Sequence, residues 1–276
     1  MESTARPTSI SAIGDAVEHA LIGIGSIVQF TGSMFLWLLS QRPCHKTVIP
    51  TFFQVGVRSV PVVAITGMFI GMVLAVQAYD AFKLMKVESQ LGSVINRSMV
   101  TELGPVLAAT MMAGRIGGAM AAEIGTMKVT EQIDALRCLG TNPIHYLVVP
   151  RFMACVVLIP LLTVIADFMG IMAGALVSTT VLRIDSFYYW QHSSSMVGPW
   201  EIFTGLCKSL VFGAEIAVIS CYRGFQSGAG AEGVGRSATQ AFVQSFIAIL
   251  ATDFLLAIFF NNLYLWIWPG EELIDI

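Results

Sequence analysis

One stretch of this chain restricts its fold more than any other: residues 59–79 hold no charged side chain between Arg58 and Asp80. As a helix with a rise of about 1.5 Å per residue, the stretch would extend about 30 Å, which matches the hydrocarbon core of a bilayer. In lipid only a helix or a closed barrel satisfies its own backbone polar groups, and barrel strands alternate apolar and polar residues. The stretch does not alternate, and it therefore predicts a membrane-spanning helix.

Charge is scarce along the rest of the chain as well. Only 12% of the 276 residues are charged, against about 25% in soluble domains. The sequence predicts an all-α integral membrane protein with five transmembrane helices, at about 57–80, 93–119, 150–182, 201–222 and 237–268. Ser237 and Gln240 fit a capping box that would open the last of these helices.

The N-terminal region has a different pattern. Residues 9–30 place apolar side chains at every third or fourth position, with Asp15, Glu18 and His19 on the other side, which predicts an amphipathic helix along the membrane surface. Residues 20–41 carry no charge and could form a sixth span, but their glycines and polar residues favour an embedded elbow. We expect an interfacial region at 1–45 and a membrane domain at 46–276.

A polar segment separates the second and third predicted spans. Residues 121–137 are too polar to cross a bilayer and are helical by composition. We expect one short surface helix there, with an apolar side and a polar side. The apolar side would hold Ile124, Met127, Ile133 and Leu136, and the polar contacts would come from Glu123, Thr126, Lys128, Glu131, Gln132 and Asp134.

The basic residues predict the orientation. With a cytosolic N-terminus, five spans place ten of the 15 basic residues inside or at the inner boundary and five outside, as the positive-inside rule requires. The acidic C-terminal tail would then lie outside.

Three glycine pairs at four-residue spacing, Gly67/Gly71, Gly114/Gly118 and Gly170/Gly174, would let helices approach closely in lipid, within one protomer or between two.

Several function classes are disfavoured. A net charge of −3 argues against nucleic acid as a partner. The four histidines are scattered, the five cysteines form no CxxC, and no nucleophile and base occur together, so neither a metal site nor an enzyme is indicated. The run from Gly228 to Gly233 matches a dinucleotide fingerprint but follows a membrane helix, so we interpret it as a flexible loop. No phosphate-binding GxxxxGK[ST] motif occurs.

Four motifs in order are specific: Glu102-Leu-Gly-Pro105, Ala113-Gly-Arg115, Ala122-Glu-Ile-Gly125 and Thr130-Glu-Gln-Ile133. With Pro150-Arg-Phe152, Pro160-Leu-Leu-Thr163, Lys208-Ser209, Asp253-Phe254 and the glycine-rich Gly224 to Gly235 stretch, the chain resembles the MlaE (YrbE-like) permease family of lipid-transporting ABC systems from about residue 15 to 265.

The resemblance implies a homodimeric, multi-pass permease of the bacterial inner membrane with a cytosolic N-terminus and a periplasmic C-terminus. Its partners would be a cytosolic MlaF-like ABC ATPase and a periplasmic MlaD-like protein with an MCE domain, with room for a small cytosolic accessory subunit. The cargo would be phospholipid or a related lipid. This chain would bind no cofactor, and ATP and Mg²⁺ would be bound by the partner ATPase.

The resemblance also favours a role for the 121–137 segment in coupling to that ATPase, over the alternative of a plain connector.

Polar residues inside the membrane are the second group of interest, because a charge at the bilayer centre costs about 3 kcal/mol. Glu102, beside the helix-bending Gly104-Pro105, is the functional candidate, and static contacts are expected for Asp167 and Asp253. The intramembrane polar set is Arg115, Asp167, Lys208, Glu215 and Asp253.

A lipid path is expected along the outer half of the first two spans. Its residues would be Leu74, Ala78, Phe82, Met85, Arg97 and Glu102, an apolar stripe beside two charges.

The alternative function is a proton-coupled secondary transporter that uses the intramembrane acids. That class often has inverted repeats, which this sequence does not show. Co-purification of an ATPase subunit would separate the two.

Overall fold

The computed structural model describes residues 9–40 and 45–268, and within these ranges the chain is helical apart from short connections and has no strand. The prediction of an all-α membrane protein is therefore confirmed. The predictions that rest on Arg6, Arg42, Cys44 and the acidic tail concern positions outside the described residues.

The helices follow one another with short connections. In chain order they are α1 (Ser9–Ser40), α2 (His45–Phe52), η1 (Phe53–Val57), α3 (Val60–Met85), η2 (Glu88–Gln90), α4 (Leu91–Ser98), η3 (Met99–Leu103), α5 (Gly104–Met112), η4 (Ala113–Gly117), α6 (Gly118–Val129), α7 (Gln132–Cys138), η5 (Ile144–Val148), α8 (Val149–Thr180), α9 (Ser186–Met196), α10 (Pro199–Phe225) and α11 (Gly230–Ile267). η2 is a 3₁₀ turn, and the other four η elements are π-helical turns.

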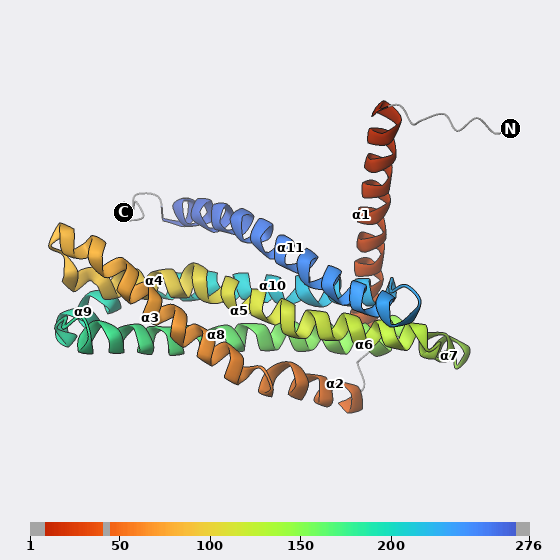
Figure 1. Ribbon diagram of the computed structural model, residues 1–276, viewed down its shortest axis with the longest axis horizontal. Coiled ribbons are helices and arrows are strands. Elements are labelled where there is room, and N and C mark those ends of the chain that lie inside the picture. The colour runs from red at the N-terminus through yellow and green to blue at the C-terminus, as the bar shows by residue number, and fades with distance from the viewer. Residues whose placement is uncertain (1–8, 41–44, 269–276) are drawn as a thin grey trace.

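The long helices form one lengthwise bundle, and α1 stands across it (Figure 1). α7 marks one end of the bundle and α9 the other, and we refer to them as the α7 end and the α9 end. α1 joins the bundle at the α7 end, where it contacts η5, α8 and α10. An amphipathic helix that crosses a transmembrane bundle in this way suits an interfacial elbow.

Within the described residues, five helical stretches are long and apolar enough to cross a membrane: Leu21–Ser40, Thr47–Met85, Ile144–Thr180, Pro199–Phe225 and Gly230–Ile267. The last four correspond to the first, third, fourth and fifth predicted spans. The second predicted span lies within an unbroken helical path from Leu91 to Val129 that runs along the bundle, and it is not among these five stretches. Residues 21–40 are apolar enough to span but lie in the crosswise helix α1.

Prolines account for two of the π-helical turns. A proline inside a helix lacks the N–H that would bond to the carbonyl four residues earlier, and its ring clashes with that carbonyl. η3 lies directly before Gly104 and Pro105, and η5 lies directly before Val149 and Pro150. The wider turn relieves the clash, and the helical path continues instead of ending.

Two predicted helix boundaries are wrong. The 121–137 segment is not one helix, because α6 ends at Val129 and α7 begins at Gln132 after a turn in which Glu131 has a left-handed φ of 60°. α11 begins at Gly230 and not at Ser237, whose hydroxyl donates instead to the Val234 carbonyl at 2.8 Å. Most of the glycine-rich stretch is therefore helical rather than a flexible loop.

The glycine pairs pack helices within one protomer. A Cβ on Gly71 would lie 2.0 Å from the carbonyl oxygen of Gly170, and one on Gly67 would lie 2.5 Å from that of Ala166. α3 and α8 therefore touch backbone to backbone along the first and third pairs. The pair on the second span faces α11, since Gly114 lies against the Phe242 ring.

Candidate functional site

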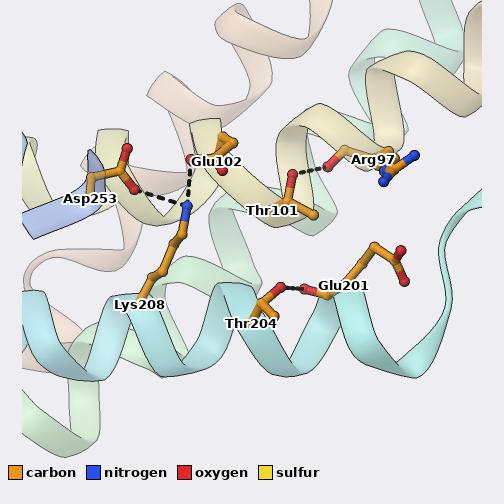
Figure 2. A network of polar contacts seen from close by, with 7 residues as sticks. All are labelled: Arg97, Thr101, Glu102, Glu201, Thr204, Lys208 and Asp253. Carbon is orange, nitrogen blue, oxygen red and sulfur yellow. Dashed lines mark hydrogen bonds and ion pairs between the residues drawn. The ribbon is translucent and has the colours of Figure 1, made fainter. Parts of the chain in front are cut away.

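A three-residue ionic network joins three helical elements inside the bundle (Figure 2). Nζ of Lys208 on α10 lies 2.6 Å from Oε2 of Glu102 on η3 and 3.1 Å from Oδ1 of Asp253 on α11. We call these residues the Lys208 network. It brings together three of the predicted intramembrane residues, and it gives Asp253 an interhelical contact with Lys208.

The network is charged and largely withdrawn from the surface. The Lys208 side chain is 2% exposed and that of Asp253 is 21% exposed, whereas Glu102 keeps 45% of its side chain exposed. One ammonium group between two carboxylates leaves one negative charge in excess. Each carboxylate gains an ion pair with Lys208, which offsets part of the cost of its desolvation.

A cavity of about 150 Å³ opens beside the network. One part of its wall is polar and comes from η3, α4 and α10, and the other part is aromatic and comes from α10 and α11. Its lining includes Arg97, Thr101, Glu102, Thr204 and Lys208 on the polar part and Trp200, Phe260 and Tyr264 on the aromatic part. A wall of this mixed character fits a molecule with both a polar and an apolar part.

The predicted apolar stripe lies elsewhere. Leu74, Ala78 and Phe82 are half-buried against a cluster built around Leu91, Ile95, Met99 and Tyr189, and Met85 is exposed. Arg97 and Glu102 line the cavity beside the Lys208 network, which the stripe does not line. Within the described residues, the structure brings the two charged residues together and keeps the stripe apart from them.

The remaining intramembrane acids have separate surroundings. Glu215 on α10 accepts a hydrogen bond of 2.5 Å from the hydroxyl of Thr252 on α11. Asp167 on α8 lies against Gly104, so closely that a Cβ there would lie 1.6 Å from its Oδ1. Arg115 on η4 lines a second cavity with Glu123 and Arg151.

The polar side chains of the 121–137 segment fall into two groups. Glu123 forms an ion pair of 3.0 Å with Arg151, and Lys128 donates to the Ser227 carbonyl at 3.0 Å, so both tie α6 to neighbouring elements. Asp134 pairs with its neighbour Arg137 on α7 at 3.0 Å, and this pair is exposed. The exposed group at the α7 end, which could contact a partner, is Thr126, Glu131, Gln132 and Asp134. Of the residues expected on the apolar side, Ile124 and Ile133 are buried and Met127 is half-buried.

Sequence analysis missed the aromatic side of the cavity. Trp200 packs against Phe260, Tyr264 and Trp268, with ring centroids 5.7 to 6.4 Å apart. The available signal in the sequence was Trp200 at the start of α10, because the start of α10 lies beside the end of α11.

The chain is similar in sequence to several known proteins. The chain matches the family described as Permease MlaE over residues 48–259. It is 46% identical over 233 residues to a probable ABC transporter permease protein of Rickettsia felis, covering 84% of this chain and 90% of the relative. It is 41% identical over 227 residues to a probable ABC transporter permease protein of Synechocystis, covering 82% and 86%.

A further relative is the intermembrane phospholipid transport system permease protein MlaE of Haemophilus influenzae, which is 32% identical over 252 residues, 90% of this chain and 95% of the relative. The family match includes all four of the motifs on which the resemblance rested. The resemblance is confirmed, and the chain belongs to the MlaE permease family of ABC transporter permeases.

Proposed function

We propose that this permease moves phospholipid, or a closely related lipid, between the bacterial inner membrane and a periplasmic carrier protein with an MCE domain. A separate cytosolic ATPase supplies the energy, and ATP and Mg²⁺ bind to that subunit. The α7 end faces the cytosol and the α9 end faces the periplasm, which leaves the N-terminus cytosolic and the C-terminus periplasmic.

The observation that carries the proposal is the Lys208 network beside its half-aromatic cavity. A phospholipid has a charged head group and apolar chains, and the polar and aromatic walls match these two parts. The network links η3, α10 and α11, so a change in the spacing of these helices alters the charge presented to the head group.

A second copy of the chain completes the site in this proposal. The cavity of one protomer, about 150 Å³, is smaller than the roughly 300–1,000 Å³ typical of sites for small molecules. α11 has little of its apolar surface buried, and Leu250, Phe254 and Leu255 are exposed on it. In a homodimer this helix would close the lipid cavity between two protomers.

We expect lipid transfer only when the whole system is present. The chain is reconstituted in proteoliposomes with its ATPase and carrier, and transfer of a fluorescent phospholipid to acceptor vesicles is measured with and without ATP. ATP should be required, and a proton gradient alone should give no transfer. Transfer by the chain alone under a proton gradient would instead establish the secondary transporter that the intramembrane acids suggested.

Charge reversal at the α7 end is expected to uncouple transport from ATP hydrolysis. Glu131→Lys with Asp134→Lys should lower ATP-dependent lipid transfer at least about tenfold, equivalent to about 1.4 kcal/mol of lost interaction with the ATPase. Both side chains are exposed and Asp134 has only its neighbour Arg137 as a partner, so the fold should be retained.

The matched control is Asp80→Lys, an exposed acid near the α9 end of α3. It changes the charge in the same direction but lies far from the proposed ATPase contact. Transfer and ATPase pull-down should be normal in this control. If the double variant also transfers lipid and binds the ATPase normally, α7 is a plain connector.

A further inference from the structure

A second cavity with charged walls lies towards the α7 end. Its volume is about 420 Å³, and its walls come from α2 and η1, from η4 and α6, and from η5 and α8. It shares no lining residue with the cavity at the Lys208 network. Sequence analysis assigned no ligand to it.

Positive charge is in excess in this cavity. It is lined by three guanidinium groups, from Arg58, Arg115 and Arg151, and by one carboxylate, from Glu123. Glu123 pairs with the buried Arg151 at 3.0 Å, and Arg151 also donates to the Leu147 carbonyl at 2.7 Å. Among residues 9–40 and 45–268, no carboxylate lies within ion-pair distance of Arg58 or Arg115, so two positive charges are left for a ligand.

The geometry of the wall favours an anion with several oxygens. Arg151 is held in place by two contacts, so it forms a fixed side of the cavity. Arg58 lies with its guanidinium carbon 6.0 Å from the centre of the Phe53 ring, which limits where its charge can point. Planar guanidinium groups bind phosphate oxygens in pairs, and the Gln54 side-chain amide lies in the same wall as a further donor.

The surface next to the cavity is apolar. Ile49, Phe53 and Val57 recur at every fourth position along α2 and η1, and all three are exposed. Aliphatic and aromatic side chains beside a pair of unpaired arginines suit acyl chains attached to an anionic group. A free phosphate ion would make no use of this apolar surface.

We propose that this cavity binds the phosphate group of an anionic phospholipid, with Arg58 and Arg115 as its ligands and the acyl chains along Ile49, Phe53 and Val57. Basic pockets between membrane helices at the cytosolic side are suited to such head groups. The lipid is held at the side of the bundle and is not the cargo, whose cavity lies at the Lys208 network. It would fix α2 against α6 and α8.

The test uses the full chain in nanodiscs of phosphatidylcholine. A phosphatidylglycerol with a photoreactive acyl chain is added, and its crosslinks are mapped by peptide mass spectrometry. We expect crosslinks in residues 45–58, and about tenfold fewer of them in the variant Arg58→Gln with Arg115→Gln. Arg236→Gln, which removes an exposed arginine of α11 outside the cavity, is the matched control and should leave them unchanged.

Three results would overturn the proposal. The first is equal crosslinking of residues 45–58 in the double variant and in the wild type. The second is equal crosslinking by a photoreactive phosphatidylcholine, because the two unpaired arginines should favour the anionic lipid. The third is displacement by millimolar inorganic phosphate, which would identify a site for the free ion. Crosslinks near residues 200–264 report lipid in the cargo cavity. A loss of crosslinks in residues 45–58 alone therefore contradicts this proposal, and a loss near residues 200–264 alone contradicts the proposed function.

Discussion

Replacing Lys208 by methionine is expected to lower the free energy of unfolding by about 3 kcal/mol. The substitution removes the shared cation and leaves Glu102 and Asp253 close together without compensation. The value lies at the low end for a broken buried ion pair, because Glu102 keeps 45% of its side chain exposed and is screened more than a fully buried acid. Unfolding by denaturant in mixed micelles, followed by circular dichroism, measures the loss.

Two variants make this result specific. Lys83→Met, which removes an exposed lysine on α3 whose amine lies 5.4 Å from the centre of the Tyr79 ring, should cost less than about 1 kcal/mol. Adding Glu102→Gln and Asp253→Asn to the Lys208 variant removes the uncompensated carboxylates and should restore part of the stability. If Lys208→Met unfolds at the wild-type denaturant concentration, the network contributes no net stability.

Gly71→Ala is expected to destabilise the protein by about 1 to 3 kcal/mol, although alanine favours helix formation over glycine by about 1 kcal/mol. The new methyl group would lie 2.0 Å from the Gly170 carbonyl oxygen, which is backbone and cannot rotate away. α3 and α8 must then separate, and this contact is the most extensive between any two helices of the described residues. The same unfolding assay measures the effect.

Gly118→Ala is the matched control for this substitution. Its Cβ would lie 3.8 Å from the nearest atom, the Ala238 carbonyl oxygen, which is an ordinary contact distance. It should therefore be neutral or stabilising through helix propensity alone. Equal effects at the two positions would mean that propensity, and not the backbone contact between α3 and α8, determines the stability.

The transmembrane organisation could be predicted because hydropathy and helix length are local properties. The long charge-free run before Asp80 and the single acids in the runs around Asp167 and Asp253 locate three spans without any tertiary information. The family resemblance came from ordered motifs and was equally local. What the sequence leaves open is which helix faces which, and the glycine pairs illustrate this, because their spacing is the same whether they pack within or between protomers.

The site was predicted in part, for a related reason. Glu102, Lys208 and Asp253 were each recognisable as costly charges in apolar surroundings, but their pairing depends on how η3, α10 and α11 come together. The break at Glu131 was missed because a left-handed residue other than glycine leaves no strong sequence signal. Composition alone made residues 121–137 look like one helix.

The unbroken path from Leu91 to Val129 has a mechanical consequence. Its 39 positions make a rod of about 58 Å at about 1.5 Å per residue, in which Glu102 is the twelfth position and the exposed turn before α7 lies just past the far end. A push on that turn along the rod axis reaches the carboxylate through covalent backbone, without relay by side chains. Two π-helical turns, η3 and η4, lie on this rod, and such turns are positions at which helices kink, so Glu102 in η3 lies at one of them.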